Sequence, residues 1–562
     1  MNAERLLRHY EKIADTPDAI PRLRRFILEL AVRGKLVAQD PDDEPASEIL
    51  KRIANQKARK RTVQEDNAKI TNHLNDLGPY SIPTNWLWTT LGAVGDWGSG
   101  ATPSRSNLDY YGGEITWLKS GELNDNRHLV GSEETITQLA MQECSFRINK
   151  AGDVLFAMYG ATIGKVAILA ETAVTNQAVC GCTPSDALLN QYLFMFLLSH
   201  RQKFQQSGRG GAQPNTSKQK IVPTPIPLPP LAEQRRIVSK VDELMGLCDE
   251  LESRREEREG YRDGLVRSSY GRLNETEGND FRAAASFAIK TLGSLTARSN
   301  QIKHLRQTIL NLAVRGKLVP QDPTDEPVEE LVKKLIDVKK KLSGLRNDAP
   351  KSHAITPFPI PSRWSWITIG DTCTKTGSGS TPRGGKDVYV QNGVPFLRSQ
   401  NVYNDGVRLD DVAYIDESTH VRMSGTSVKP GDLLLNITGG SMGRCCRVPD
   451  HFAIANISQH VAIIRPAIRG LEDFLHLVVL SPYFQAFVFE SQTGAGRGGL
   501  PKNKMDQISV PLPPLAEQRR IVAKVNELNA LCDELESSLT TTDTTRKQLL
   551  ESLLIEALTT ND

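Results

Sequence analysis

Long hydrophobic runs are missing from this 562-residue sequence, and none approaches the ~18 residues needed to cross a bilayer. The N-terminus also lacks a signal-peptide pattern. Cysteine is scarce, with eight residues and no disulfide framework. The pair Cys180-Gly-Cys182 has no second pair to complete a zinc site, and the adjacent Cys445 and Cys446 have no partner motif. We therefore expect a cytoplasmic protein with reduced thiols, no membrane partner and no metal site.

An excess of one charge is missing as well. The chain has 69 Lys and Arg against 66 Asp and Glu, a net charge of +3. This mild basicity does not by itself indicate a nucleic-acid partner. Apolar residues make up 39% and charged residues 24%, which describes a globular protein. A chain of this length exceeds a single core and suggests roughly three or four units.

Catalytic motifs are also missing. The ten histidines show no metal-ligand spacing, and neither G-x-S-x-G nor H-E-x-x-H occurs. Asn176-Gln177 and Asn456-Ile457 lack the prolines of the Asn-Pro-Pro-aromatic tetrad used by amino-methyltransferases. We expect no catalytic residue in this chain.

One glycine-rich segment, GATIGKV (160–166), invites comparison with a phosphate-binding loop. It is one residue short of that spacing, and Val166 replaces the hydroxyl that would bind magnesium. The similar segment GGSMGRC (439–445) keeps neither the lysine nor the hydroxyl. We interpret both segments as glycine turns between strands and keep Lys165 and Arg444 as candidate contacts.

The chain repeats itself at a distance of 284 residues. PLPPLAEQRRIVSKVDELMGLCDELE (227–252) returns as PLPPLAEQRRIVAKVNELNALCDELE (511–536), with 22 of the 26 positions identical. The prolines prevent a helix before this stretch, and Pro230 or Pro514 suits a first helical position. Glu233 and Glu517 then lie in the first turn, near the positive end of the helix dipole. One structural unit is therefore used twice.

Each copy of this helix carries an apolar seam with alternating spacings of four and three. The seam residues are Ile237, Val241, Leu244, Cys248 and Leu251, and then Ile521, Val525, Leu528, Cys532 and Leu535. Such a seam requires a partner helix. We predict that the two copies pair with each other. The alternative is an ordinary amphipathic helix packed on its own domain.

The repeat extends to shorter helices. LRRFILELAVRGKLV (23–37) matches LRQTILNLAVRGKLV (305–319), and Gly34 or Gly316 fits a left-handed C-terminal cap. The QDPDDEP and QDPTDEP loops lead into second helices that carry the basic stretches 51–61 and 333–341. A solvated helix face is the favoured interpretation of those charges, and phosphate contact is the alternative.

Two segments of about 150 residues read as globular α+β domains. The runs ITWLKS, DVLFAMYG and KVAILA, and later VPFLRS, DLLLNITG and HVAIIRP, predict strands, with helices near 188–205 and 471–491.

The fold class is therefore α+β with an internal two-fold pseudo-repeat of about 280 residues. The predicted divisions are an N-terminal helical region (1–79), a first globular domain (80–226), a first seam helix (227–272), a linker and start of the second repeat (273–300), a second helical region (301–357), a second globular domain (358–510) and a second seam helix (511–562). The best linker signal between the halves lies at 271–280.

The two globular segments share only a skeleton, including a tryptophan pair. Trp86 and Trp88, like Trp364 and Trp366, alternate as residues of one strand would. We expect one of each pair in the core, with base stacking as the alternative.

A glycine-rich loop with a central arginine precedes each long helix. In SGRGG (207–211) and GAGRGG (494–499), backbone amides could approach a phosphate closely while Arg209 or Arg497 supplies a charged fork. Lysines lie alongside. A flexible surface loop is the alternative interpretation.

Two repeats of a globular domain followed by a P-L-P-P-L-x-E-Q-x-x-I-V helix closely resemble the specificity subunit of Type I restriction–modification enzymes. The resemblance spans essentially the full chain, and the helix motif is its most specific part. The LAVRGKLV and QDPxDEP segments are similar to the branch with an N-terminal helical extension. The resemblance implies two target recognition domains, each reading half of a split, asymmetric site in double-stranded DNA. It also implies that the long helices form an antiparallel, coiled-coil-like pair that sets the spacing. A helix of about 40 residues is ~60 Å long, enough for half-sites about one duplex turn, ~34 Å, apart.

The same resemblance implies partners and cofactors. Two methyltransferase subunits would dock on the helices and methylate adenine N6 with S-adenosylmethionine. Restriction subunits that use ATP and magnesium would join the full complex, and this chain would hold no cofactor. Its setting would be a bacterial or archaeal cytoplasm, in defence against phage. An assembly scaffold whose domains bind proteins is the alternative function.

The candidate DNA contacts are basic residues of the two domains: Arg105, Lys119, Lys165, Arg209, Lys218, Lys220, Arg383, Arg398, Arg444, Arg497, Lys502 and Lys504. Residues 80–226 carry eleven Lys and Arg against eleven Asp and Glu, and residues 358–510 carry fifteen against thirteen. Since neither domain is strongly basic, we expect tight binding to need partner subunits that close around the duplex.

Overall fold

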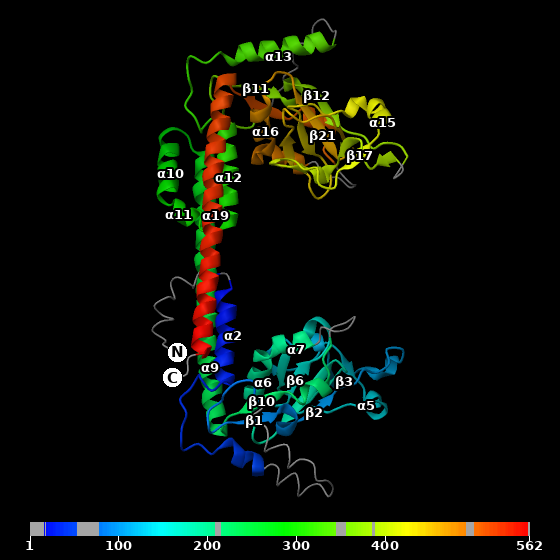
Figure 1. The fold of residues 1–562 in the computed structure, drawn as a ribbon, viewed down its shortest axis with the longest axis vertical. Helices are drawn as coiled ribbons and strands as arrows, with labels where there is room; N and C mark the ends of the chain where they lie inside the picture. The colour runs from blue at the N-terminus through cyan, green and yellow to red at the C-terminus, as the bar shows by residue number, and fades with distance from the viewer. Residues whose placement is uncertain are drawn as a thin grey trace. The chain divides into compact units, whose positions relative to one another are not determined.

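The structure, a computed structural model, describes residues 16, 18–52, 78–207, 215–343, 356–384, 388–490 and 499–559. The chain divides into two compact units, residues 1–257 with 543–562, and residues 258–542. Each unit contains one globular domain and the first part of one long helix (Figure 1).

The two long helices are α9 (Leu231–Glu275) and α19 (Leu515–Thr559), each of 45 residues. At 1.5 Å per residue each is ~68 Å long. Each begins directly after the second proline of its pair, as predicted. Helix α9 starts in the first unit and ends in the second, and α19 does the reverse.

Three residues of each seam are buried, and Leu244, Leu251, Leu528 and Leu535 are half-buried, but all pack against their own unit. In the first unit, Ile237 and Val241 lie in one apolar cluster with Ile27 of α2 (Ala19–Val32) and with core residues of the globular domain. In the second unit, Ile521 and Val525 lie in the equivalent cluster, which includes α12 (Ser299–Val314). This corrects the predicted pairing of the two seams. The leading helix and globular domain of each repeat carry their own apolar faces, and these cover the seam.

The last turns of each long helix complete the helix cluster of the other repeat. In the first unit, Leu550 of α19 is fully buried beside Ala19, and Leu554 packs near Leu30 of α2. In the second unit, the equivalent residues Val266 and Tyr270 of α9 pack in a cluster that contains Leu312 of α12. The same packing is therefore built twice, each time with a segment from the other half of the chain.

The segment 271–280, which the sequence favours as a linker, is helical except for a short break at Thr276 and Glu277. Helix α9 continues to Glu275, and α10 (Gly278–Lys290) follows after two residues; α11 (Leu292–Leu295) leads on to α12. Ala284 and Ala288 of α10 pack in the cluster of Val266 and Tyr270. This burial offsets the poor helix propensity of glycine and asparagine.

The leading helices end as predicted. Gly34 and Gly316 have φ of +71° and +70°, and a Cβ at Gly34 would lie 2.5 Å from Pro83 Cγ. Helix α13 (Val328–Ser343) starts directly after a proline, and its Lys333 and Lys334 form ion pairs with glutamates at 2.6 and 2.8 Å. The favoured solvated face is therefore confirmed for these two residues; residues 53–61 of the other basic stretch lie outside the described part.

The first globular domain contains three sheets, with strand orders β1-β10, β2-β9-β6-β7-β4 and β5-β3-β8. The strands are β1 (Leu87–Thr90), β2 (Gly95–Ser99), β3 (Tyr111–Leu118), β4 (Asn126–Leu129), β5 (Thr135–Ile136), β6 (Val154–Ala157), β7 (Val166–Leu169), β8 (Val174–Thr175), β9 (Val179–Pro184) and β10 (Pro225–Leu228). The helices are α4 (Leu91–Val94), α5 (Gln138–Glu143), α6 (Asn190–Ser199), α7 (Arg201–Ser207) and α8 (Lys218–Ile221), with 3₁₀ turns η1 (Leu108–Tyr110), η2 (Ser120–Glu122) and η3 (Gly160–Thr162).

The second globular domain repeats the skeleton, with strand orders β11-β22, β12-β21-β18-β19, β13-β17-β14-β20 and β15-β16. Its strands are β11 (Ser365–Thr368), β12 (Cys373–Ser378), β13 (Tyr389–Val390), β14 (Val394–Leu397), β15 (Val402–Tyr403), β16 (Gly406–Val407), β17 (Ala413–Ile415), β18 (Leu433–Asn436), β19 (Cys445–Arg447), β20 (Asn456–Ile457), β21 (Val461–Pro466) and β22 (Ser509–Leu512). The helices are α14 (Ile369–Thr372), α15 (Glu417–Arg422), α16 (Glu472–Leu480), α17 (Pro482–Glu490) and α18 (Lys502–Asp506), with η5 (Ser399–Asn401) and η6 (Ser424–Thr426). The six predicted strand runs each coincide with a strand, and each predicted domain helix is a pair of helices.

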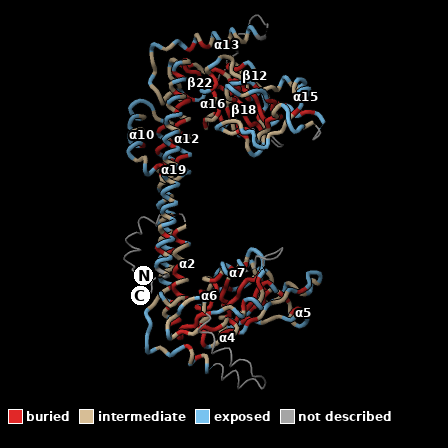
Figure 2. Tube along the Cα trace, viewed as in Figure 1, coloured by how far each residue is buried: buried red, intermediate tan, exposed pale blue. Residues whose placement is uncertain are grey.

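The entrance and exit of each domain lie together. Strand β1 pairs antiparallel with β10, from Leu87 opposite Leu228, and β11 pairs with β22 in the same way. Because β10 and β22 run directly into a Pro-Pro pair, each domain is closed at the start of its long helix. Figure 2 shows the buried residues gathered in the sheets and in helices such as α6 and α16.

Candidate nucleic-acid interface

A glycine turn joins two antiparallel strands in each domain. Strand β6 runs through η3 into β7, with Phe156 opposite Val166, and β18 turns into β19. Gly160 and Gly164 have φ of +64° and +84°, and the equivalent glycines of the second domain have +79° and +87°. The turn connects strand to strand and does not open a helix, which confirms the glycine-turn interpretation over a phosphate loop.

The basic residue that ends each glycine turn contacts a neighbouring loop. Lys165 Nζ donates a 2.8 Å hydrogen bond to Asn124 Oδ1. The Arg444 guanidinium lies 4.8 Å from the centre of the Tyr403 ring, and Arg408 lies 4.2 Å from the same ring. Both predicted cations are thus held at a turn next to side chains that can donate and accept hydrogen bonds.

Arg105 and Lys119 lie together beside an acidic pair. Glu134 accepts from Arg105 at 2.6 Å and from Lys119 at 3.0 Å, and these bonds lower the pKa of Glu134 to about 2. The Arg105 guanidinium also covers the Tyr111 ring at 4.6 Å. The structure therefore brings two of the predicted DNA contacts together, and both form ion pairs with Glu134 of their own domain.

Arg398 takes the place of Lys119 in the second domain. Each residue is the N-cap of a short 3₁₀ turn, η5 and η2. Arg398 donates to the backbone oxygen of Asp411 at 3.0 Å. Arg383 is exposed in the loop after β12.

The four predicted lysines near the long helices are exposed on short helices: Lys218 and Lys220 on α8, Lys502 and Lys504 on α18. Lys502 forms a 2.5 Å ion pair with Asp506. Arg209 and Arg497 lie outside the described residues, so their DNA contacts stay predictions.

The residues that follow the Arg-Gly-Gly loops are attached next to the glycine turns. Thr216 donates its backbone N–H to the oxygen of Met158 at 2.9 Å, and Leu500 donates to Ile437 at 3.1 Å. Met158 and Ile437 are the equivalent positions just before the glycine turns. Segments that are about sixty residues apart thus meet at one place in each domain.

The tryptophan pairs belong to the core. Trp86 and Trp88 are 4% and 3% exposed and Trp364 is 5% exposed, while Trp366 is half-buried against Phe358. Base stacking is therefore wrong as an interpretation of the three buried tryptophans. The first pair thus buries both tryptophans instead of the predicted one, and the second pair buries one, as predicted.

A buried carboxylate, which sequence reasoning placed only at a helix start, connects three segments. Glu233 is 1% exposed and accepts from Trp86 Nε1 at 2.9 Å and from Gln39 Nε2 at 2.7 Å. Burial raises the pKa of Glu233. The neighbouring Arg236 forms a bidentate pair with Asp43 of the QDPDDEP loop. Glu517, equally buried, takes the same position in the second unit and accepts from Gln321.

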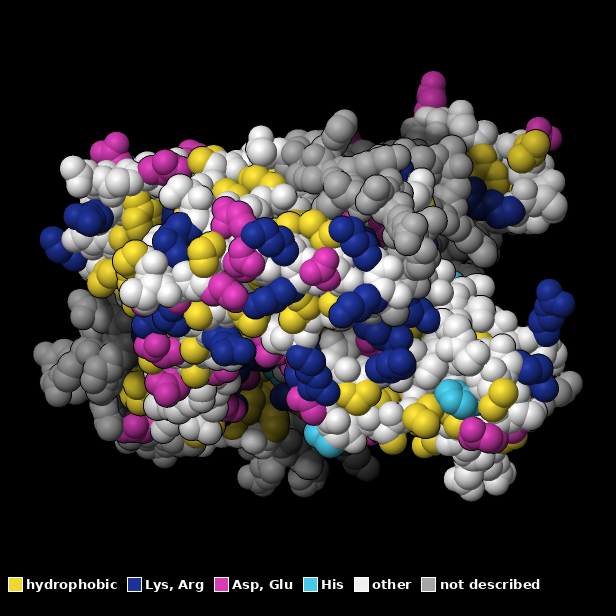
Figure 3. All heavy atoms as spheres, turned by 90° about the horizontal axis from the view of Figure 1, so that it is seen from above, with side chains coloured by type: hydrophobic (Ala, Val, Ile, Leu, Met, Phe, Trp, Pro, Cys, Tyr) yellow, Lys and Arg dark blue, Asp and Glu magenta, His cyan; other side chains and the backbone are white. Residues whose placement is uncertain are grey.

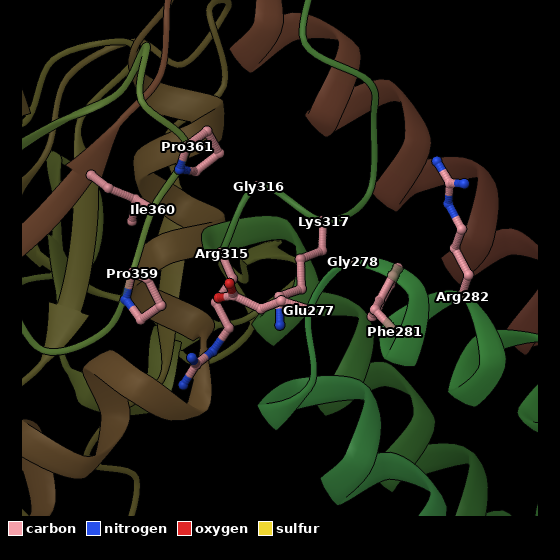
Figure 4. A pocket seen from close by; sticks show the side chains of 10 residues that line it. All are labelled: Glu277, Gly278, Phe281, Arg282, Arg315, Gly316, Lys317, Pro359, Ile360 and Pro361. Carbon is pink, nitrogen blue, oxygen red and sulfur yellow. The ribbon is translucent and has the colours of Figure 1, made fainter.

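A cavity of about 450 Å³ in the second unit lies between α10, the Gly316 turn and the segment 359–361. Figure 4 shows Pro359, Ile360 and Pro361 on one side and Phe281 on the other. Both of its central cations have partners. Lys317 donates to two backbone oxygens at the end of α9, and Arg315 lies 4.2 Å from the Phe358 ring. These contacts explain the cations as helix-end capping and packing.

Among the residues coloured in Figure 3, Lys and Arg lie interspersed with Asp, Glu and hydrophobic side chains. Within the described ranges, no group of three or more His, Cys, Asp or Glu could hold a metal ion. None of the described helices is both long and apolar enough to cross a membrane.

The family model of the Type I restriction modification DNA specificity domain matches the chain twice, over residues 83–258 and 361–542. The two matches cover more than half of the sequence. The chain belongs to this family.

The chain is similar to the specificity subunit of the Type I restriction enzyme EcoAI of Escherichia coli, with 28% identity over 96% of this chain and 94% of that protein. It is also similar to the EcoEI specificity subunit of Escherichia coli, with 27% identity over the same shares of each chain. A crystal structure of the HsdS subunit from Thermoanaerobacter tengcongensis covers 86% of this chain and 98% of its own at 20% identity, with a TM-score of 0.39.

The sequence pointed to Lys165 and Arg444 but missed Asn124, Tyr403 and Arg408, which contact them. These three residues lie about forty positions earlier, Asn124 in a loop and Tyr403 and Arg408 in or next to the β15–β16 hairpin, without a motif. Only an alignment of the two halves to each other could have singled them out.

Proposed function

We propose that this chain reads a bipartite, asymmetric site in double-stranded DNA, one half-site for each globular domain, as part of a Type I restriction–modification complex. The proposal is supported by one arrangement of strands that occurs in both domains and carries different side chains. The central strands β9-β6-β7 and β21-β18-β19 pair alike, as do the parallel pairs β3–β8 and β14–β20. The side chains at the turns nevertheless differ.

The outer faces of the long helices, in contrast, are alike. Lys240 pairs with Glu243 and Lys524 pairs with Glu527, both at 2.8 Å. The apolar side chains of Leu247 and Leu531 are both 49% exposed. A surface present twice in one chain suits two copies of one partner. We assign that partner as a methyltransferase subunit, with restriction subunits joining through it.

In this proposal the chemistry lies on the partners. The methyltransferase subunits hold S-adenosylmethionine and methylate adenine N6, and the restriction subunits use ATP and magnesium. This chain contributes base recognition and spacing. Its domains have net charges of zero and +2, from eleven minus eleven and fifteen minus thirteen. Such weak basicity supports a complex in which the partners supply much of the phosphate neutralisation.

The test is to map methylated adenines in DNA treated with the complex of this chain and its own partner subunits. We expect one motif of two different half-sites with a fixed spacer. A chimera whose residues 358–510 are replaced by a domain of another specificity subunit should change one half-site alone. A motif unaltered by the replacement would refute the division between the two domains.

A further inference from the structure

The glycine turns of the two domains are held by polar side chains at equivalent positions, 279 residues apart. Asp125 Oδ1 accepts from the backbone N–H of Val166 at 3.2 Å. Asn404 Oδ1 accepts from the N–H of Cys445 at 3.1 Å. In each domain this acceptor bonds to the residue directly after the basic residue of the turn, Lys165 or Arg444, which we call the turn cation. The two segments are therefore joined at equivalent positions in both domains.

A second anchor comes from a helix. Arg201 of α7 donates to the oxygen of Gly164 at 2.8 Å, and Gln485 of α17 donates to the oxygen of Gly443 at 2.9 Å. A Cβ at Gly164 would lie 2.7 Å from Arg201 Cγ, and one at Gly443 would lie 2.2 Å from Gln485 Oε1. Together with the positive φ of both glycines, this close approach keeps the turn cation in one place.

The side chains that lie at these turns differ between the two domains. The first domain presents Lys165 bonded to the amide of Asn124, which is itself exposed. The second presents Tyr403 with Arg444 and Arg408 stacked on its ring. The pairs 124 with 165 and 403 with 444 are also 279 residues apart. The anchors keep their role while the presented groups change their chemistry.

The residues that keep one role in both domains and the residues that differ between them suit two different kinds of DNA contact. The phosphate backbone is the same in both half-sites, so contacts to it can be made with the same side chains in both domains. Base edges differ between the half-sites, and different side chains are needed to read them. Arginine and lysine recognise the guanine acceptors O6 and N7, and asparagine recognises adenine N6 and N7.

We infer that Asn124 and Lys165 in the first domain, and Tyr403, Arg408 and Arg444 in the second, are specificity-determining residues that contact base edges, each set in its own half-site. The inference rests on the proposed function and names the residues that carry it out. The turn cation is the central contact, and its loop partner holds its side chain in the orientation that meets the base.

The test uses the complete complex with Lys165→Ala or Arg444→Ala. Each variant should relax one or two base positions of one half-site, and the two variants should affect different half-sites. Binding to the wild-type site should weaken roughly 5- to 150-fold, with binding to unrelated DNA unchanged. The conservative Lys165→Gln and Arg444→Gln variants, checked by thermal unfolding, guard against a folding defect.

Matched controls lie at the other ends of the same strands. Lys150 and Lys429 are exposed, are also 279 residues apart, and precede β6 and β18, whereas the glycine turns follow these strands. Their alanine variants should keep the wild-type motif. A weakening that is uniform across sequences, with a lower salt slope, would mean phosphate contact and overturn the inference. An unchanged motif would overturn it too. In both cases a bipartite wild-type motif would leave the proposed function standing.

Discussion

At the scale of residues, the two repeats contain the same buried polar contacts. Glu233 and Glu517, both 1% exposed, connect the start of a long helix to the QDPxDEP loop. A buried carboxylate without partners would be costly, so its donors are part of the fold.

Replacing Trp86 by Phe removes the N–H that donates to Glu233 Oε2 and keeps most of the apolar volume. We expect the free energy of unfolding to fall by about 1–3 kcal/mol, because a buried acceptor loses its partner. Urea unfolding would measure this. Trp88→Phe serves as the control, since Trp88 is equally buried but contacts Tyr80 by its ring. Equal losses in both variants would assign the effect to packing.

The titration of Glu233 gives a second test. Burial raises its pKa in the folded state, so the folded state holds the proton at a pH where the unfolded state has released it. The contribution of this group to stability is therefore full below its ordinary pKa and declines as pH rises through the raised value. Relative to Glu233→Gln, the wild-type protein should lose stability as pH rises above the ordinary glutamate pKa. A difference between the two proteins that does not change with pH would contradict this.

At the scale of elements, the AVRGKLV motif fastens the end of a long helix. Lys35 Nζ donates to the oxygen of Leu558 at 2.8 Å, and Lys317 Nζ donates to the oxygen of Asn274 at 3.1 Å. Positions 274 and 558 are equivalent in the repeat. The last carbonyls of a helix lack internal partners and favour a cation. The glycine before each lysine ends the short helix and brings the lysine to this position.

Lys317→Met should release the end of α9. We expect a loss of about 1 kcal/mol in the free energy of unfolding and faster hydrogen exchange of the amides near Asn274. Lys333→Met, which removes an exposed ion pair on α13, should cost less than about 0.5 kcal/mol. Unchanged exchange at the end of α9 would show that the two hydrogen bonds do not hold it.

The middle of each long helix connects a segment of one unit to a segment of the other. Inserting four residues after Glu252 and after Glu536 lengthens both helices by ~6 Å, against ~3.4 Å per base pair of B-DNA. We expect the spacer of the methylated site to grow by one or two base pairs while both half-sites keep their bases. Altered half-sites with the old spacer would show that the helices do not set the spacing.

At the scale of the whole molecule, each unit needs the end of a helix from the other repeat. The first unit buries Leu550, and the second buries Val266 at the equivalent position. A single repeat therefore lacks a segment that a second copy of itself could supply, by exchange of equivalent helix ends.

A fragment of residues 1–278 should for this reason dimerise, with Val266 and Tyr270 of one copy in the positions of Leu550 and Leu554. With the partner subunits it should methylate a palindrome made of the first half-site and its inverted copy. Light scattering and methylation mapping would measure the two outcomes. A monomer that supports no methylation would mean that the two helix ends are not interchangeable.

The sequence by itself determined the elements that depend on local chemistry and repetition. Proline pairs set where the long helices begin, glycines set the caps at Gly34 and Gly316, and alternating apolar runs set the strands. The specificity-family resemblance followed from the repeated helix motif.

Only the tertiary structure decided what covers each apolar face and which loops meet. A seam such as Ile237 and Val241 requires burial but does not specify its partner, and the leading helix with its own domain supplied it. The composition of residues 271–280 indicated a linker, and the structure reduces the break to two residues, with Ala284 and Ala288 of the next helix packed in the core. Tyr403 reaches Arg444 across forty residues because β18 and β19 bring their turn to the β15–β16 hairpin. Contacts of this kind depend on how sheets and helices pack, and no local pattern in the chain encodes them.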